Sequence, residues 1–442
     1  MCHTECLLVS IVPRNSVRGG LSTEGSHVLN SVAMSRRALL AASIAGVASF
    51  ALPAWAQVAE PKIMPFIYRA SDTVLADLKR RLDEVRWPDR ETGRGWEQGP
   101  PLSVLRSLVD YWRSAYNWRL CEAELAKWPQ FKTTIDGLDI HFIHVRSRHK
   151  NALPIIMTHG WPSTVLLFRD VIGPLTDPTA HGGTEADAFD VIIPSLPGFG
   201  FSDKPTERGW NADRTARAWS VLMQRLGYQR YVAQGGDWGA FVTTAMAQQQ
   251  PSGLAAIHLN FAQTIPDTIP AELLPDQKRA VDAMKAFQEK DSAYLQVQAM
   301  RPQTIGYALA DSPVGQAAWI YDIFNLGTGH TGHPEDALSR DAMLDEITLF
   351  WLTDTAASSA RFYLEQTALL GKRNPGRVDL PVGVSVFPND LPPSRSWAPL
   401  VYPKLFYWHE LDHGGHFAQL ELPGLFTDEL RRCFRSFQKI LL

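Results

Sequence analysis

One short stretch, residues 235–239, constrains the fold of this chain more than any other. It reads Gly-Gly-Asp-Trp-Gly and places Asp237 between two small residues, Gly235 and Gly239. The segment before it, 228–234, predicts a strand, and the segment after it, 240–247, predicts a helix. A turn this tight leaves no room for larger side chains beside its tip, and glycine alone lacks a Cβ atom. The sequence therefore predicts that Asp237 projects from a sharp turn between a strand and a helix.

This arrangement is the nucleophile elbow of the α/β-hydrolase fold, in which the residue at the tip attacks the substrate. Esterases and lipases place a serine at this position, where this chain has an aspartate. A carboxylate is suited to attack on a saturated carbon, and the resulting ester can be cleaved by water. Asp237 therefore indicates substitution at the carbon of an epoxide or an alkyl halide, rather than an ordinary helix N-cap.

Strands and helices alternate on both sides of the elbow, which indicates a mostly parallel sheet. The predicted strands are 153–158, 189–194, 254–260, 382–387 and 404–410, and the helices between and after them are 165–175, 213–226 and 426–440. Between about 262 and 378 the alternation stops and the sequence is largely helical. An insertion of this length after the strand beyond the elbow predicts a helical lid.

The region before the first parallel strand has a different pattern. Apolar residues recur at helical spacing after Ser71, a plausible N-cap, and further helices are expected at 101–117 and from Arg119. The dipeptide at 136–137, Asp-Gly, predicts a hairpin between two strands in 131–145. The expected segments are a leader (1–56), an N-terminal region (57–150), the first part of the α/β core (151–261), the lid (262–378) and the second part of the core (379–442).

The leader has the features of an export signal. Arg36 and Arg37 precede an apolar stretch of about 16 residues, which is short for the ~20 of a membrane span. The stretch ends in Ala-Trp-Ala at 54–56, a cleavage pattern that makes Gln57 the first mature residue. Paired arginines indicate the twin-arginine route, and Met34 is the better-placed start. We expect a periplasmic or secreted protein without a stable membrane span in its mature chain, rather than an anchored one.

Charge and cysteine content argue against three features: a nucleic-acid partner, a disulfide and a metal site. The net charge of −3 and the lack of a basic run argue against a nucleic-acid partner. Two of the four cysteines lie in the leader, and Cys121 and Cys433 belong to no metal-ligand pattern. We expect neither a disulfide nor a metal site.

Hydrolysis of an ester on Asp237 requires a base that activates water. His416 follows the last predicted strand, and the order nucleophile, acid, histidine is that of the hydrolases. His413 is the alternative. Asp390 follows the penultimate strand and is expected to orient the histidine, with Glu410 and Asp412 as alternatives close to it in sequence.

The same reaction requires hydrogen-bond donors. The ester carbonyl becomes an oxyanion, which the backbone N–H groups of Trp238 and Trp161 are positioned to meet. Epoxide opening also requires a proton donor, for which a neutral tyrosine is suitable. The residues alone do not choose between the lid tyrosines Tyr294, Tyr307, Tyr321 and Tyr363.

Four motifs together resemble those of the microsomal-type epoxide hydrolases, which include the juvenile hormone epoxide hydrolases. They are His-Gly-Trp-Pro, Pro-Ser-Leu-Pro-Gly-Phe-Gly-Phe-Ser, Gln-Gly-Gly-Asp-Trp-Gly and Gly-Gly-His-Phe, at 159–162, 194–202, 234–239 and 414–417. The likeness runs from about 63 to 437. It implies that Tyr294 and Tyr363 hold and protonate the epoxide oxygen, that Asp390 is the orienting acid, and that no metal or organic cofactor takes part.

The preferred interpretation is an exported epoxide hydrolase that converts an epoxide and water to a vicinal diol, in keeping with a role in detoxification. A haloalkane dehalogenase with the same aspartate nucleophile is the alternative enzyme, in which Trp238 could hold one side of the halide. A non-catalytic binding protein on a hydrolase scaffold is the alternative from another class. The two lid tyrosines favour the epoxide.

Overall fold

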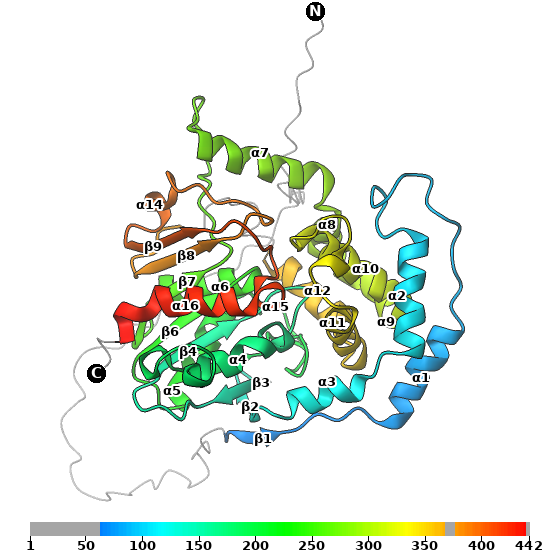
Figure 1. Ribbon diagram of the computed structural model, residues 1–442, viewed down its shortest axis with the longest axis horizontal. Coiled ribbons are helices and arrows are strands. Elements are labelled where there is room, and N and C mark those ends of the chain that lie inside the picture. Colours follow the sequence, from blue (N-terminus) through cyan, green and yellow to red (C-terminus); the bar gives the residue numbers. More distant parts are fainter. Residues whose placement is uncertain (1–61, 367–375, 439–442) are drawn as a thin grey trace, which may run out of the picture. The chain divides into compact units, whose positions relative to one another are not determined.

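The computed structural model describes residues 62–366 and 376–438 (Figure 1). The predicted leader and its export signal lie outside the described residues. Among the helices that are described, none combines the length and the hydropathy required to cross a membrane. The described residues belong to a single compact unit, 59–442, so the segments expected from the sequence after the leader are parts of one folded body.

Within the described residues, nine strands form one sheet in the order β1-β2-β3-β5-β4-β6-β7-β8-β9. The strands from β5 to β9 are parallel, and β1, β2 and β3 are added as an antiparallel edge. Their bounds are β1 Met64–Phe66, β2 Gln130–Ile135, β3 Leu138–Val145, β4 Leu153–Thr158, β5 Phe189–Pro194, β6 Tyr231–Gly235, β7 Leu254–Leu259, β8 Val382–Val386 and β9 Leu405–Glu410.

The predicted α/β-hydrolase architecture is confirmed, with differences at the ends of elements. β4 and β5 have the predicted bounds, whereas β6 begins three residues later than expected, at Tyr231. β1 has no predicted counterpart, because three residues are too few to show a period. The hairpin between β2 and β3 turns at Asp136 and Gly137, both with positive φ, as the Asp-Gly dipeptide predicts.

Helices cover both faces of the sheet. The chain steps from β4 to β5 in one direction and then from β5 through β6 to β7 in the other. Because such crossovers are right-handed, α4 (Arg169–Thr176) lies on the opposite face from α5 (Ala212–Arg225) and α6 (Trp238–Gln249). α4 packs against α16 (Pro423–Gln438), and α5 packs against α6. The loops that follow β4 and β6 therefore diverge, which creates a crevice at the carboxyl ends of these strands.

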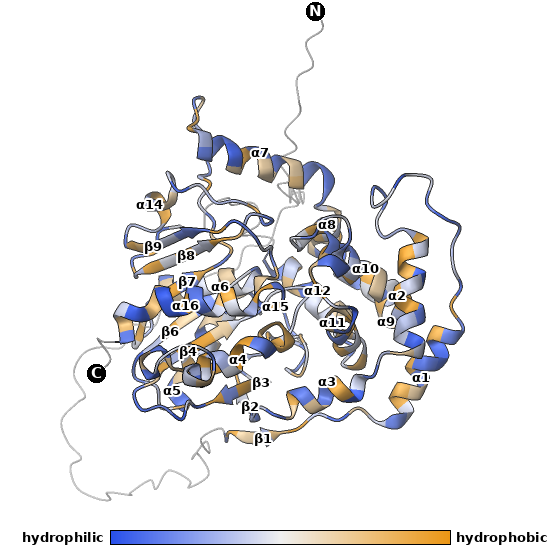
Figure 2. Cartoon of the chain, viewed as in Figure 1, coloured by the Kyte–Doolittle hydropathy of each residue, from blue (hydrophilic) through white to orange (hydrophobic). Residues whose placement is uncertain are grey.

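The segment between β7 and β8 is helical, as expected. It contains α7 (Pro275–Lys290), α8 (Ala293–Met300), α9 (Pro302–Asp311), α10 (Pro313–Gly327), α11 (Arg340–Leu352) and α12 (Ala356–Glu365). α12 packs against α8 and α9, and α10 packs against α9 and α11. Apolar residues are concentrated on the central strands, whereas α7 is mostly hydrophilic (Figure 2).

The N-terminal helices pack against this lid. They are α1 (Asp72–Asp83), α2 (Leu102–Ser114) and α3 (Trp118–Leu125), and Ser71 caps α1 as predicted, by accepting a hydrogen bond from an N–H of the first turn. α1 contacts α10, and α3 contacts α11. The Tyr111 hydroxyl donates to Asp341 at 2.8 Å and the Tyr116 hydroxyl donates to Asp345 at 2.6 Å, both on α11. This region therefore supports the lid from outside.

The turn between β6 and α6 has the geometry of the predicted elbow. Asp237 has φ 48° and ψ −128°, a positive-φ backbone conformation that is rare for residues other than glycine. A Cβ atom on Gly235 would lie 2.1 Å from the carbonyl oxygen of Gly239, and one on Gly239 would lie 1.9 Å from that of Thr158. Both glycines are therefore required because α6 starts in direct backbone contact with β4 and β6.

Candidate active site

Four loops at the carboxyl ends of parallel strands bring the predicted polar residues together. Asp237 follows β6, Trp161 follows β4, Asp390 follows β8 and His416 follows β9. Crevices at this edge of open α/β sheets are the usual place for a ligand. The structure therefore places the nucleophile, acid and histidine of the sequence prediction in one site.

Asp237 is held by the backbone of the loop after β4. The Trp161 N–H donates to its Oδ1 at 2.8 Å. This approach depends on Gly160, since a Cβ atom there would lie 2.1 Å from the same oxygen. Trp238 is the first residue of α6, where an N–H has no acceptor within the helix. Both backbone groups expected to meet the oxyanion therefore lie beside the Asp237 carboxylate.

His416 bridges the two aspartates. Its Nδ1 lies 2.9 Å from Asp390 Oδ2, and its Nε2 lies 3.4 Å from Asp237 Oδ2. The second oxygen of Asp390 accepts the N–H of Leu391 at 2.7 Å, which fixes the orientation of the carboxylate. The backbone N–H of His416 donates to the Gly327 carbonyl at the end of α10, at 2.7 Å. The imidazole is thus oriented from both the core and the lid.

The alternatives for these two roles lie elsewhere. His413 is 60% exposed and pairs with its neighbour Asp412. Glu410 pairs with Arg279 and accepts a hydrogen bond from the Trp408 indole. None of these three groups contacts His416 in the described structure, whereas Asp390 does.

The two carboxylates decide the charge of His416. Burial is the largest single influence and favours the neutral ring, but the combined attraction of Asp390 and Asp237 outweighs it. The pKa of His416 is therefore raised well above its ordinary 6.5. The free protein therefore favours the protonated form of His416.

Two of the four lid tyrosines cover the nucleophile. Tyr294, on α8, stacks on the Trp161 ring, with centroids 5.4 Å apart and an interplanar angle of 14°. Tyr363, on α12, meets the Trp238 ring edge-on at 4.6 Å and lies 6.2 Å from Tyr294. Burial, followed by the charges of Asp237 and Asp390, raises the pKa of Tyr294 above its ordinary value. Burial, followed by Tyr294 and Asp237, does the same for the pKa of Tyr363. Both residues are therefore neutral phenols beside the carboxylate.

The other two tyrosines are separated from the site. Tyr307 is 71% exposed on α9. Tyr321 is buried, but its hydroxyl donates to Glu335 at 3.2 Å and its ring packs against Trp96. Of the four tyrosines, the structure therefore brings Tyr294 and Tyr363 to the site and leaves Tyr307 and Tyr321 away from it.

Several residues that support the site were not predicted. Phe261 packs its ring against His416 at 5.5 Å. Glu421 accepts hydrogen bonds from the backbone N–H groups of Phe417 and Gly329, which joins the loop that carries His416 to the lid. Asn260 accepts the Gln234 amide at 2.8 Å beneath the elbow. Asn260 could have been suspected, because it ends a predicted strand, but no sequence pattern indicates the other contacts.

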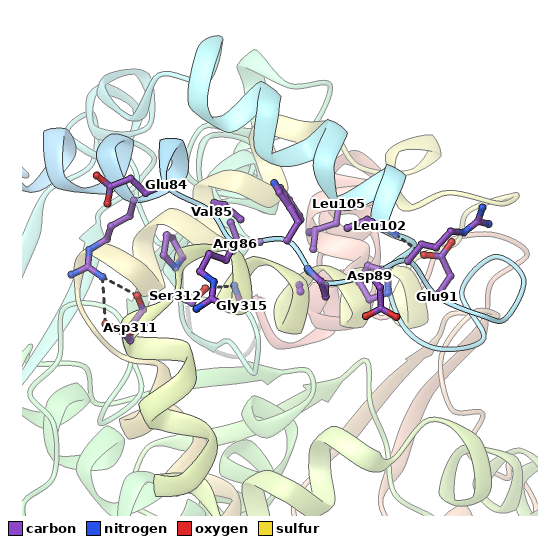
Figure 3. Close-up of a pocket in the computed structure, with 18 of the residues that line it drawn as sticks. Glu84, Val85, Arg86, Asp89, Glu91, Leu102, Leu105, Asp311, Ser312 and Gly315 are labelled. Carbon is purple, nitrogen blue, oxygen red and sulfur yellow. Dashed lines mark hydrogen bonds and ion pairs between the residues drawn. The ribbon is translucent and has the colours of Figure 1, made fainter.

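No cluster of His, Cys, Asp and Glu with the arrangement of a metal site occurs in 62–366 or 376–438. A surface groove of about 850 Å³ lies apart from the site, between the loop that joins α1 to α2 and the start of α10 (Figure 3). Arg86 and Asp89 line it together with Asp311, so neither sign of charge predominates. None of the active-site residues lines this groove.

Comparisons with known proteins agree with this geometry. Residues 63–168 match the family model "Epoxide hydrolase N terminus", and residues 154–303 match "alpha/beta hydrolase fold". A protein of Stigmatella aurantiaca named "Putative epoxide hydrolase" is 58% identical, over 85% of this chain and 86% of its own length. Epoxide hydrolase 1 of Sus scrofa is 36% identical, over 84% of this chain and 88% of its own.

The similarity extends to a solved structure. The crystal structure of juvenile hormone epoxide hydrolase from the silkworm Bombyx mori superimposes with a TM-score of 0.78 and 29% sequence identity, and the match covers 86% of this chain and 96% of the other. Sequence relatives, family models and this structure indicate the same enzyme class. The chain therefore belongs to the microsomal-type epoxide hydrolase family and is an epoxide hydrolase with the α/β-hydrolase fold.

Proposed function

We propose that this epoxide hydrolase works through a covalent ester on Asp237. The observation that carries the proposal is the position of the Asp237 carboxylate. One of its oxygens accepts the Trp161 N–H at 2.8 Å, and the other lies 3.4 Å from His416 Nε2. A carboxylate with a base on one side and a donor on the other has what both formation and hydrolysis of an ester require.

In the first step an oxygen of Asp237 attacks one carbon of the epoxide ring. A bond forms between this oxygen and the carbon, and the ring C–O bond breaks. The alkoxide takes a proton from Tyr294 or Tyr363, whose raised pKa values keep them protonated until the oxygen becomes strongly basic. The imidazolium of His416 replaces this proton, so the step leaves a neutral ester, a neutral histidine and both phenols.

In the second step water attacks the carbonyl carbon of the ester. Conversion of the Asp237 carboxylate to an ester removes one of the two negative charges that raise the pKa of His416. Burial then favours the neutral imidazole, which can take a proton from water. Asp390 keeps the ring in place, and the Trp161 and Trp238 N–H groups meet the oxyanion. The intermediate then collapses with cleavage of the bond between the carbonyl carbon and the substrate oxygen. The departing alkoxide takes the proton left on the hydroxyl that came from water, which releases the diol and restores the Asp237 carboxylate, with His416 again protonated.

The dehalogenase alternative is disfavoured by the lid. A halide leaves as an anion and needs no proton, whereas two buried phenols beside Asp237 suit an oxygen that must be protonated. The relatives described above are named as epoxide hydrolases as well.

We also propose that the enzyme is exported, and that it detoxifies epoxides, which are reactive electrophiles. The support is the leader itself: paired arginines, a short apolar stretch and an Ala-Trp-Ala pattern. Export by the twin-arginine route would deliver a folded enzyme to the periplasm or the medium.

The covalent step can be tested by trapping. In the His416→Gln variant, mixing with styrene oxide should add the mass of one epoxide to the peptide that contains Asp237. The ester still forms, with solvent returning the proton that His416 otherwise gives to the tyrosine, but it is not hydrolysed. His413→Gln, a matched change in the same loop, should turn over normally. Peptide mass spectrometry checks both. Loss of turnover without any adduct, over a range of epoxides, would contradict the proposal.

The tyrosines should act in the first step only. Replacement of Tyr294 or Tyr363 by phenylalanine should slow ester formation by about 100-fold, the usual size of a general-acid contribution. Hydrolysis of the ester should change little, and Tyr307→Phe should behave as wild type. Rapid-quench measurement of the ester under single-turnover conditions separates the two rates. Unchanged ester formation in the double variant would exclude the assignment.

Export makes a prediction about the N-terminus. Protein recovered from the periplasm or medium should begin at Gln57, as read by N-terminal sequencing, and an Arg36→Lys/Arg37→Lys variant should accumulate inside the cell. Recovery of exported protein with residues 1–56 intact would overturn the cleavage site.

A further inference from the structure

A buried carboxyl group on the lid contacts the loop after β4, whose Trp161 N–H binds Asp237. Glu346, on α11, is 0% exposed. Its Oε2 accepts a hydrogen bond from the Thr164 hydroxyl at 2.7 Å. The other oxygen, Oε1, has no hydrogen-bond partner among the described residues. A buried polar group of this kind is costly and calls for an explanation.

Thr164 lies in the loop after β4, which also carries Trp161, and its hydroxyl takes part in two hydrogen bonds. Its hydroxyl also accepts the Leu166 N–H at 3.2 Å, which starts the short helical turn Val165–Phe168. Three residues before Thr164, the Trp161 N–H donates to Asp237 Oδ1. The path from the lid to the nucleophile therefore runs from Glu346 through Thr164 and Trp161.

The neighbouring residue secures the other end of the same segment. Asp345 forms an ion pair with Arg169, the first residue of α4, and accepts the Tyr116 hydroxyl at 2.6 Å. Two consecutive acids of α11 thus hold residues 164 and 169. Burial raises the pKa of Glu346 to about 7, with Arg169 opposing and Asp345 adding to the rise. The carboxyl group is therefore uncharged at acidic pH, which lowers the cost of burying it there.

We propose that Glu346 is a positioning residue for ester hydrolysis: through Thr164 it holds the Trp161 N–H where the oxyanion forms. The inference rests on the proposed ester on Asp237 and adds a part of the lid to the machinery of the second step. Glu346 acts through Thr164 and takes no part in proton transfer. Formation of the ester, which develops charge on the epoxide oxygen instead, should depend on it much less.

The test compares two replacements of similar size under single-turnover conditions with styrene oxide. Glu346→Gln keeps an oxygen that accepts from Thr164, and Glu346→Met removes it without opening a cavity. Glu346→Met should slow hydrolysis of the ester about tenfold or more, part of what loss of an oxyanion donor costs, and leave ester formation within about threefold. Glu346→Gln should retain hydrolysis within about threefold of wild type.

A matched control lies on the same helix. Asp341→Ala removes the acceptor of the Tyr111 hydroxyl, outside the loop, and should leave both steps unchanged. Thr164→Val removes the hydrogen bond from the other side, and its effect should not add to that of Glu346→Met. Melting temperatures are measured beside the rates, because Glu346→Met leaves the buried Thr164 hydroxyl without its acceptor and lowers stability. A general loss of stability would slow both steps, whereas the inference predicts slower hydrolysis alone.

Three outcomes would overturn the inference: equal hydrolysis rates for Glu346→Met and Glu346→Gln, equal slowing of both steps, or full additivity with Thr164→Val. If Glu346→Met does not fold, the comparison of Thr164→Val with Thr164→Ser decides in the same way, with serine expected to keep hydrolysis. Failure of the wild type to form any ester on Asp237 would instead contradict the covalent mechanism, so the two failures are distinguishable.

Discussion

The hydrogen bond between the Trp161 N–H and Asp237 Oδ1 depends on close approach of the loop after β4, the turn after β6 and the first turn of α6. The loops after β4 and β6 diverge because the chain runs from β4 to β5 in one direction along the sheet and from β5 to β6 in the other, yet their first residues remain in contact. Gly160 and Gly239 permit that contact, since a Cβ atom on either would collide with a neighbour. The strained backbone of Asp237 follows from the same packing and presents its carboxylate to the crevice.

The lid completes the site by adding groups that the core lacks. α8 and α12 bring two phenols over the carboxylate, and the end of α10 holds the backbone of His416. In the proposed mechanism, the attraction between His416 and the two carboxylates sets the protonation state of the histidine in each step. A cation is favoured while both carboxylates are ionised, and a neutral base is favoured once Asp237 is an ester. One residue can thus serve a resting state and a hydrolytic state without moving.

Much of this arrangement could be predicted from the sequence because it is local. The elbow, the hairpin at Asp136 and the parallel strands carry patterns within a few residues of one another. His416 and Asp390 could be placed because strand ends meet at one edge of a parallel sheet. The tyrosines could not, because their positions depend on how lid helices pack. Family resemblance chose them, and the rings around Trp161 agree. The role proposed for Glu346 rests on a contact 182 residues apart in sequence, which no local pattern reports.

The covalent ester is the central claim, and the origin of the oxygen in the diol tests it most directly. In a single turnover of the wild-type enzyme in H₂¹⁸O, with enzyme in excess over epoxide, the oxygen added to the substrate comes from the Asp237 carboxylate. The account predicts an unlabelled diol from this turnover and ¹⁸O in the peptide that contains Asp237. A diol that carries ¹⁸O after the first turnover, with an unlabelled peptide, would show direct attack by water and would contradict the account.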